Sequence, residues 1–362
     1  MKIQDICSYA PKSDIKAGEA KENGEYAFFT SSADEDKKID RYLYDGEGII
    51  MGTGGNATLH YFCGRYSVST DCLVLIPNKD FKSKYLYYFF LHNMRVLEAG
   101  FKGAGLKHTN KKYIGSIELK RIHSIAEQSK IIRNLSEIDD QITKGKRIIE
   151  ILDELVKSRF VEMFGDVIRN DRGWSQYVFE DITESRLGKM LDAKKQTGEH
   201  AYPYLANFNV QWFKFSTDIL NEMDFDEKDR NEFELREGDL LVCEGGEIGR
   251  CAIWHNEVQP CYFQKALHRV RCKREYLLPE YLAWWFKYNC DHGGFSAIEG
   301  AKATISHLPG AKLKKLNVTV PEIERQEEFV DFLAQTDKSK HCVKNDLLRC
   351  LQKQVLSKSY RR

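Results

Sequence analysis

The amino-acid sequence predicts an α/β protein with two α/β domains in a pseudo-twofold repeat, separated by two long antiparallel coiled-coil helices. Two observations predict this fold. Blocks of similar sequence occur twice in the same order, and two proline-free segments carry a heptad pattern of apolar residues. A chain of 362 residues is also long enough for more than one domain. We place the first domain at 1–122, its helix at 123–166, the second domain at 167–320 and its helix at 321–362.

The first repeated blocks are a short strand that ends in a glycine turn and, further on, an aromatic helix. "GEGIIMGTGG" at Gly46–Gly55 matches "EGDLLVCEGG" at Glu237–Gly246, and each predicts a turn, a buried strand and a Gly-Gly turn. "KYLYYFFLHNM" at Lys84–Met94 matches "EYLAWWFKYNC" at Glu280–Cys290, and both predict an amphipathic or buried helix. Two unrelated domains that share turn chemistry are the alternative, and the constant order of the blocks argues against it.

The next repeated block is a basic, glycine-rich loop. "GAGLKHTNKKYIGSIELKRI" at 103–122 and "GAKATISHLPGAKLKKLNVTV" at 300–320 each predict such a loop followed by a strand. A long helix follows each, with Gln128 opposite Gln326. The first domain lacks most of a segment matching Trp174–Lys195, so we expect one of its loops to be shortened or built differently.

Both long helices are predicted from their heptad seams. The first runs from Ser124 to Met163 without proline, and the second follows Pro321, which suits a helix start. Thr336 and Lys340 interrupt the second seam. The residues expected to pack the helices together are Leu135, Ile138, Ile142, Ile149, Leu152, Val156, Phe329, Leu333, Val343, Leu347 and Leu351.

A helix of this length, about 60 Å at 1.5 Å per residue, needs a partner to cover its apolar seam. The other helix of the same chain is one partner, and because an entire domain lies between them the two can pair antiparallel. The pair would then act as a ruler that holds the domains apart. A coiled coil that dimerises two chains is the alternative.

Composition indicates an ordered protein of the cytoplasm. The sequence is 42% hydrophobic and 12% aromatic, and its formal net charge is +1. Its ten cysteines include no CxxC pair, which favours reduced, mostly buried thiols over a disulfide or zinc scaffold. The N-terminus has no signal-peptide pattern and no apolar run reaches the length of a membrane span.

Catalytic motifs are missing from the sequence. It contains no GxxxxGK[ST] loop, GxSxG elbow, HExxH helix or Asn/Asp-Pro-Pro-aromatic motif of amino-methylating enzymes. The glycine stretches "GTGG" and "GAGLK" lack the strand–loop–helix context of a dinucleotide site. We therefore expect a binding protein that holds no metal and is not an enzyme.

Local charge predicts a nucleic acid as the partner. Basic residues gather in the two glycine-rich loops and in "QKALHRVRCKR" at Gln264–Arg274, where they could contact phosphates. Asn, Gln, Arg and Lys near glycine turns and aromatic residues could contact base edges. The candidate DNA-binding residues are Ser31, Ser32, Asn56, Thr58, Lys102, Lys107, His108, Thr109, Asn207, Asn209, Gln211, Lys214, Arg250, Gln264, Lys265, Lys302 and Thr304.

Four segments carry a resemblance to a known family: "FVEMFGD" with "RNDRGW" (Phe160–Trp174), "REGDLLVCEGGEIGRCAIW" (Arg236–Trp254), "LPEYLAWWF" (Leu278–Phe286) and "LKKLNVTVPEIERQEEFVDFL" (Leu313–Leu333). Together they resemble the specificity subunit of type I restriction–modification systems, over essentially the whole chain. The resemblance implies double-stranded DNA as the partner and two target-recognition domains, each reading one half of a split, asymmetric sequence through the major groove. It also implies that the two long helices set the gap between the two half-sites of the DNA sequence and dock two methyltransferase subunits.

The resemblance further implies how the chemistry is divided among subunits. This chain would be non-catalytic and bind no cofactor. The methyltransferase subunits would supply S-adenosylmethionine and methylate adenine, and two restriction (motor-nuclease) subunits would use ATP and Mg. The alternatives are the recognition subunit of a related system with a fused methyltransferase–nuclease chain, a self-contained DNA methyltransferase or nuclease, and a coiled-coil interaction protein without a nucleic-acid role.

Overall fold

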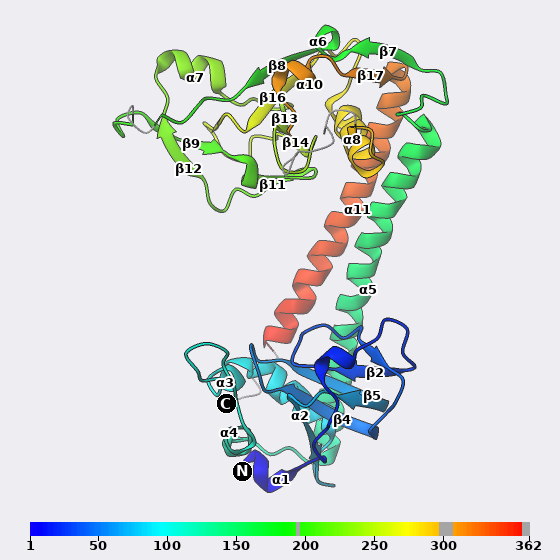
Figure 1. The fold of residues 1–362 in the computed structure, drawn as a ribbon, viewed down its shortest axis with the longest axis vertical. Helices are drawn as coiled ribbons and strands as arrows, with labels where there is room; N and C mark the ends of the chain where they lie inside the picture. The colour runs from blue at the N-terminus through cyan, green and yellow to red at the C-terminus, as the bar shows by residue number, and fades with distance from the viewer. Residues whose placement is uncertain (193–195, 297–306, 357–362) are drawn as a thin grey trace. The chain divides into compact units, whose positions relative to one another are not determined.

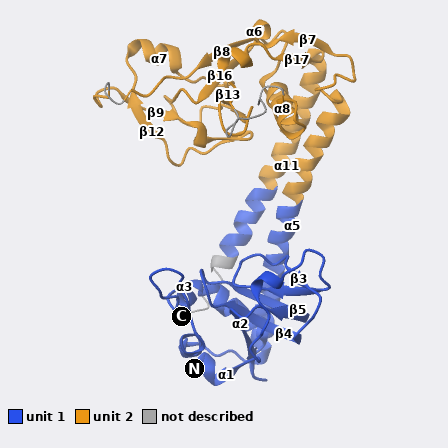
Figure 2. Cartoon of the chain, viewed as in Figure 1, with its two compact units in different colours: residues 1–147, 343–362 blue, residues 148–342 orange. Residues whose placement is uncertain are grey.

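The computed structural model describes residues 1–192, 196–296 and 307–356, and the chain forms two compact units (Figure 2). Unit 1 contains residues 1–147 and 343–362, and unit 2 contains residues 148–342. Each unit combines sheets with helices, and both long helices, α5 (Ile125–Phe164) and α11 (Ile323–Leu356), contribute to both units. The predicted class, two α/β domains with long helices between them, is confirmed.

Unit 1 is built on one six-stranded sheet with strand order β1-β6-β4-β5-β2-β3. Only β2 and β5 run parallel, and all other neighbours are antiparallel. The aromatic helix α2 packs on β4 and β5 (Figure 1). The elements are α1 (Ile3–Ile6), β1 (Cys7–Tyr9), η1 (Ala17–Glu19), β2 (Tyr26–Phe29), β3 (Lys38–Ile39), β4 (Tyr44–Gly52), β5 (Leu59–Val68), β6 (Cys72–Pro77), α2 (Ser83–His92), α3 (Met94–Glu98) and α4 (Lys111–Ser116).

Unit 2 divides its strands among smaller sheets, of which the largest have the orders β14-β13-β16-β8 and β12-β9-β15. A pair, β17-β7, and a hairpin, β10-β11, complete the strands of its described part. The elements are β7 (Ser175–Val178), α6 (Phe179–Ile182), β8 (Thr183–Leu187), β9 (Ala201–Leu205), η3 (Asn207–Asn209), β10 (Val210–Gln211), β11 (Lys214–Phe215), β12 (Asn221–Asp224), α7 (Glu227–Phe233), β13 (Leu240–Cys243), β14 (Cys251–Ile253), β15 (Tyr262–Phe263), β16 (Leu267–Cys272), α8 (Pro279–Asp291), α10 (Gly310–Leu313) and β17 (Asn317–Val320).

The two units repeat one strand order. β1-β6-β4-β5 in unit 1 corresponds to β8-β16-β13-β14 in unit 2, and every neighbouring pair in both sets is antiparallel. The parallel pair β2–β5 corresponds to β9–β15. The single long strand β5 therefore takes the place of both β14 and β15. Because residues 254–261 interrupt that strand in unit 2, its sheet is divided where the sheet of unit 1 is continuous.

The start of unit 1 corrects one prediction from the sequence. In unit 1, α1 "IQDI" leads into β1, which pairs with β6, and in unit 2, α6 "FEDI" leads into β8, which pairs with β16. A single β-bridge between Lys2 and Glu118 stands where unit 2 has the pair β7–β17. The prediction that the first domain lacks most of the segment matching Trp174–Lys195 was therefore wrong. The four-residue helices are too short for their similarity to stand out in sequence.

The strand predicted at the end of each basic loop forms in only one unit. In unit 2 it is β17, which pairs with β7 over four residues. In unit 1 the corresponding stretch forms α4 and then only the Lys2–Glu118 bridge, so the predicted strand there was wrong. Asn110 starts α4, because its side chain accepts a hydrogen bond from the N–H of Tyr113 at 3.0 Å.

A buried glutamine fixes the start of each long helix in the same way. Gln128 Oε1 accepts from the N–H of Lys82, while its Nε2 donates to the carbonyls of Asp80 and His123, each at 2.9 Å. Gln326 makes the same three bonds to Leu278, Tyr276 and Pro321, at 2.8–2.9 Å. Neither side chain is exposed to solvent. The Gln128–Gln326 match read from the sequence is thus a pair of equivalent clamps between helix and domain.

The long helices pair antiparallel within unit 1. Cys350 Sγ lies 3.1 Å from Gln141 Oε1, and Leu347 lies against Gly145. A Cβ on Gly145 would come within 2.5 Å of the Leu347 side chain, so this glycine permits a close approach of the helices. Leu351 is 44% exposed, and the buried Cys350 takes the packed position instead. The described seam residues of unit 1 are the buried Leu135 and the half-buried Ile138, Ile142, Val343 and Leu347.

The same helices pair antiparallel within unit 2. Lys340 Nζ lies 2.7 Å from Asp153 Oδ1, and the rings of Phe160 and Phe329 are 5.5 Å apart. The two polar interruptions of the seam are therefore accommodated, since Lys340 has an acidic partner and Thr336 donates to the carbonyl of Phe332. The seam residues of unit 2 are the buried Val156 and Phe329 and the half-buried Ile149, Leu152 and Leu333. These contacts confirm the predicted antiparallel pairing.

The ten cysteines are free thiols, and five of them are buried. Burial raises the pKa of the Cys243 thiol to about 11 and that of Cys261 to about 12. Such thiols carry little thiolate at neutral pH, and the thiolate is the reactive form. The buried cysteines therefore act as small core residues, as their scattered spacing predicts.

Candidate nucleic-acid interface

A glycine turn and a histidine come together at the same place in each unit. In unit 1, Gly54 forms a β-bridge with His108, and the N–H of Thr109 donates to the carbonyl of Thr53 at 2.9 Å. In unit 2, Gly245 forms a β-bridge with His307, and the N–H of Leu308 donates to the carbonyl of Glu244 at 2.6 Å. A Cβ on either glycine would come within 3.4 Å of the histidine ring. We call these two places the polar edges of the units.

The second residue after the parallel strand completes each polar edge. In unit 1, Ser31 follows β2, and its Oγ accepts from the N–H groups of Thr53 and Gly54 at 3.2 and 3.4 Å. In unit 2, Asn207 follows β9, and its Nδ2 donates to the carbonyl of Gly245 at 3.1 Å. Candidates that lie far apart in the sequence are therefore neighbours in each fold.

The polar edge of unit 1 gathers most of its candidate residues. Lys102 and His108 exchange both backbone hydrogen bonds at 3.0 Å, and Lys107 accepts from the N–H of Gly55. Their side chains are exposed, as is that of Asn56. Ser32 and Thr58 are half-buried and Thr109 is buried. The hydroxyls of Thr58 and Thr109 are buried and have no hydrogen-bond partner among the described residues.

The candidate residues at the polar edge of unit 2 differ in burial, and some of them have structural roles. Asn209 is 1% exposed, and its amide bonds the backbone of Ala206, Ser216 and Ile219 at 2.9–3.0 Å, which gives it a structural role instead of a base-contacting one. Arg250 is half-buried and donates to the carbonyl and side-chain oxygens of Asn207. Gln211 and Lys214, on the hairpin β10-β11, are exposed.

The remaining candidates of unit 2 lie beside β15 or outside the described residues. Gln264 is half-buried, and its N–H donates to the carbonyl of Leu205 at 3.1 Å. Lys265 is exposed next to it. Lys302 and Thr304 lie outside the described residues.

Three basic side chains of the run on and after β16 are hydrogen-bonded inside unit 2. Arg271 forms two hydrogen bonds with Asp239, at 2.6 and 3.0 Å. Arg269 donates to the backbone carbonyls of Glu232 and Glu234, and Lys273 donates to that of Asp181. Lys265 and Arg274, near the two ends of the run, are exposed. The sequence did not indicate the internal hydrogen bonds, because the partners lie about 30 to 90 residues away along the chain.

Sequence reasoning missed two features of the polar edges. In unit 1 the loop after Ser32 is acidic, with Asp34, Glu35 and Asp36, and the buried His60 bonds Glu35 at 2.7 Å and the Ser32 carbonyl at 3.0 Å. In unit 2, Phe208 is 54% exposed. The acidic run was visible in the sequence, whereas the exposure of one phenylalanine among many buried ones was not.

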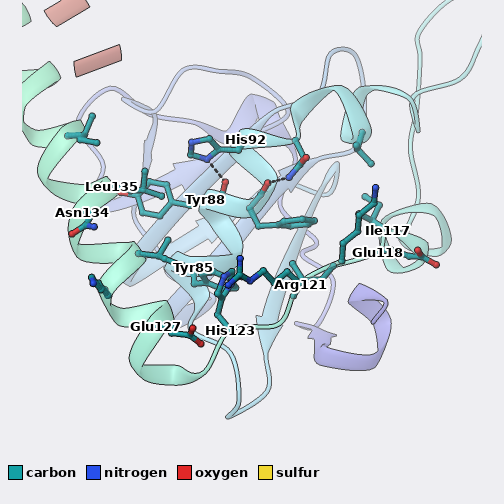
Figure 3. A pocket seen from close by; sticks show the side chains of 18 residues that line it. Tyr85, Tyr88, His92, Ile117, Glu118, Arg121, His123, Glu127, Asn134 and Leu135 are labelled. Atoms are coloured by element: carbon teal, nitrogen blue, oxygen red, sulfur yellow. Dashed lines mark hydrogen bonds between the residues drawn. The ribbon is translucent and has the colours of Figure 1, made fainter. Parts of the chain in front are cut away.

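A separate cavity of about 740 Å³ lies in unit 1 between α2, the segment after α4 and the start of α5 (Figure 3). Tyr85, Tyr88 and Leu135 line its apolar part, and Tyr85 Oη lies 2.7 Å from Nδ1 of His123. In unit 2 the corresponding place, between α8 and the start of α11, is filled by Phe160 from the end of α5, whose ring lies 5.8 Å from Tyr281 and 5.5 Å from Phe329. The end of α11, which corresponds in unit 1 to the end of α5 in unit 2, lies partly outside the described residues.

Within the described residues, no group of three or more His, Cys, Asp or Glu side chains is arranged to hold a metal ion. Among the helices of the described part, none is long and apolar enough to cross a membrane.

Two units that share one strand order and one glycine–histidine bridge define an internally repeated α/β protein. The chain belongs to the family of the type I restriction modification DNA specificity domain, whose model matches residues 1–153 and 171–349. It is a type I restriction–modification specificity subunit, which agrees with the prediction that it is a recognition protein and not itself an enzyme.

Two curated relatives are similar in sequence. The chain is 21% identical over 306 residues to a putative type I restriction enzyme specificity subunit of Haemophilus influenzae, covering 82% of this chain and 76% of the relative. It is 24% identical over 158 residues to the MjaVIII specificity subunit of Methanocaldococcus jannaschii, covering 42% of this chain and 36% of the relative.

Two solved structures share the fold. A type I restriction–modification S subunit from M. genitalium matches with a TM-score of 0.65 at 13% identity, over 98% of this chain and 93% of that one. A chain from a study of complex assembly and conformational transition in a type I system matches with a TM-score of 0.55 at 12% identity, over 99% and 96%.

Proposed function

We propose that each unit of this specificity subunit reads one half of a bipartite, asymmetric DNA sequence through its polar edge. The observation that carries the proposal is the repetition of the glycine–histidine bridge on one strand order, with different side chains around it in the two units. A common scaffold with different loops suits two half-sites of different sequence, because loops on a rigid scaffold carry recognition.

Contacts to the DNA backbone come from exposed lysines at the polar edges. Lys102 and Lys107 of unit 1 and Lys214 and Lys265 of unit 2 have exposed side chains. Phosphate contacts of this kind position the protein without reading sequence and make binding depend on salt. Asn56, His108 and Gln211, which are also exposed, are then available for base edges in the major groove.

The long helices set the gap between half-sites and dock the partner subunits. Ile148, Ile151 and Leu155 on the part of α5 in unit 2 are exposed apolar residues next to the packed seam. Exposed apolar residues on a helix favour a protein partner, and we assign this surface to two methyltransferase subunits. Those subunits supply S-adenosylmethionine and methylate adenine, and two restriction subunits supply ATP- and Mg-dependent cleavage, so this chain binds no cofactor of its own.

A helix-shortening variant tests the proposal. Removing residues 145–151 from α5 and the facing 341–347 from α11 deletes one heptad from each and preserves the packed seam. The helices shorten by about 10 Å, so the gap in the methylated sequence should shrink by about three base pairs. Sequencing of methylated DNA from cells with the variant and its methyltransferase measures the gap.

Deletion of the heptad from α5 alone is the matched control. It shifts the seam of one helix against the other and should abolish methylation. A doubly shortened variant that methylates the original sequence with an unchanged gap would contradict the spacer role.

A further inference from the structure

Phe208 is an exposed aromatic residue in a unit whose other aromatic side chains are mostly buried. The residue is 54% exposed, in the turn η3 that follows β9. Phe213, the other exposed phenylalanine of this segment, stacks on Trp284 with ring centroids 4.5 Å apart. Phe208 makes no such ring contact among the described residues. Exposing an apolar ring of this size has a cost, which a bound ligand would recover.

The backbone on both sides of Phe208 is fixed by side chains. On one side, Asn207 donates to the Gly245 carbonyl at 3.1 Å and accepts from Arg250 at 3.1 Å. On the other, the buried Asn209 bonds three backbone groups at 2.9–3.0 Å. The carbonyl of Phe208 itself accepts from Gln211 Nε2 at 3.2 Å. The ring is therefore exposed on a rigid turn, which lowers the entropy cost of binding through it.

Its position places Phe208 at the polar edge of unit 2. The preceding residue, Asn207, contacts Gly245, which is bridged to His307. The amides of Asn207 and Asn209 are already bonded within the protein, so the two asparagines beside the ring are not available for base edges. Phe208 is the side chain that this turn offers to a ligand.

We propose that Phe208 reads the methyl group of a thymine in the half-site recognised by unit 2, an inference that rests on the proposed function. In the major groove, thymine is the base that presents a methyl group, and an aromatic ring can contact it but cannot hydrogen-bond to the other base edges. Phe208 thereby selects T over C at one position. In unit 1 the corresponding position after β2 and Ser31 is Ser32, so this reading belongs to one half-site only.

The experiment replaces thymine by uracil, which removes only the methyl group. The full chain is purified with its methyltransferase subunit and the target is taken from the methylated sequence of the host. Each T of the unit 2 half-site is changed to U in turn, and affinity is measured by fluorescence anisotropy. The intact complex should lose about fourfold at one position, the value expected for one buried methyl group.

Substitution of the ring should remove that sensitivity. Phe208→Ala should bind the T-containing target about tenfold more weakly and no longer distinguish T from U. Phe208→Leu, which keeps an apolar side chain, should retain part of the discrimination. Ile219→Ala is the matched control, because Ile219 is 72% exposed and its carbonyl is held by the same Asn209. It should bind like the unaltered complex.

Several results would overturn the inference. One is a unit 2 half-site in which no T-to-U change alters affinity. Another is a Phe208→Ala complex that binds weakly but still distinguishes T from U, which would indicate a ring wedged between base pairs. An equal loss in Ile219→Ala would assign the effect to a general apolar surface. If the intact complex binds no bipartite target, the proposed function fails and this inference fails with it.

Discussion

The two units share a strand order and a glycine–histidine bridge, yet they differ in the loops around it. Unit 1 has one continuous sheet and an acidic loop after β2, whereas unit 2 has a divided sheet and the exposed Phe208 after β9. The scaffold residues that hold each edge are buried or bonded, and the residues that differ are on loops. The comparison indicates that this fold keeps its scaffold fixed and varies the side chains that it presents.

A second difference concerns the packing at the start of the two long helices. In unit 2, Phe329 lies three residues after Gln326, is fully buried, and has its ring 5.4–5.5 Å from those of Phe160 and Phe164. In unit 1, Ile131 lies three residues after Gln128, is half-buried, and lines the cavity of about 740 Å³. Equivalent substitutions in the two units should therefore have unequal costs here and equal costs at the glutamine clamps.

The largest expected effect is the loss of the Phe329 ring. Phe329 is fully buried, and Phe329→Ala should lower the free energy of unfolding of unit 2 by about 3 to 5 kcal/mol. Ile131→Ala, at the corresponding position of unit 1, should cost only about 1 to 2 kcal/mol because its side chain is half-buried. Denaturation followed by hydrogen exchange in each unit measures both. Equal costs would contradict this difference in burial.

The glutamine clamps should respond equally. Gln128→Leu and Gln326→Leu each leave one backbone N–H and two carbonyls without their partner, at a cost of about 3 kcal/mol in each unit. Faster amide exchange at Lys82 and at Leu278, the two N–H groups that the glutamines accept from, reports each loss separately. A clear effect in one unit only would mean that the clamps are not equivalent.

Removing two lysines from the polar edge of unit 1 should weaken DNA binding without changing its sequence preference. The double variant Lys102→Ala/Lys107→Ala should lower the slope of log affinity against log salt by about 2, because each phosphate contact contributes about 0.9. Lys228→Ala, an exposed lysine on α7, is the control and should leave the slope unchanged. A shift in the methylated sequence of the double variant would instead assign these lysines to base reading.

The smallest expected effect is a dependence of stability on pH in both units. Burial lowers the pKa of His268 in unit 2, and burial together with the nearby Arg121 lowers the pKa of His123 in unit 1. As the pH falls below about 6.5, the unfolded chain therefore binds protons before the folded one does, and the free energy of unfolding decreases. His268→Gln should reduce this decrease in unit 2 and leave it in unit 1. A stability that rises on acidification to pH 5 would contradict the assignment.

The sequence predicted the repeated elements well where their signal was long or periodic. The helix expected at Ser124–Met163 is observed at Ile125–Phe164, because forty residues of heptad pattern leave little ambiguity. The short α1 and β1 escaped detection, since four-residue elements carry almost no periodicity. Tertiary contacts decide whether such segments form.

The candidate site was predicted in outline but not residue by residue. Ser31 and His108 were predicted as candidates without a reason to be adjacent, and the fold supplies that reason because both contact Gly54. Asn209 and Arg271 have side chains suited to DNA contact, yet both are bonded within the protein. A sequence lists donors and acceptors, whereas only the fold shows which of them are already paired.

An exchange of one domain tests directly whether each unit reads its own half-site. Residues 167–320 are replaced by the corresponding domain of the Haemophilus influenzae relative, the long helices are kept, and the methylated sequence is determined in cells that carry the cognate methyltransferase. One half-site should change while the other half-site and the gap between them stay as they were. A change in both half-sites, or in neither, would contradict this prediction.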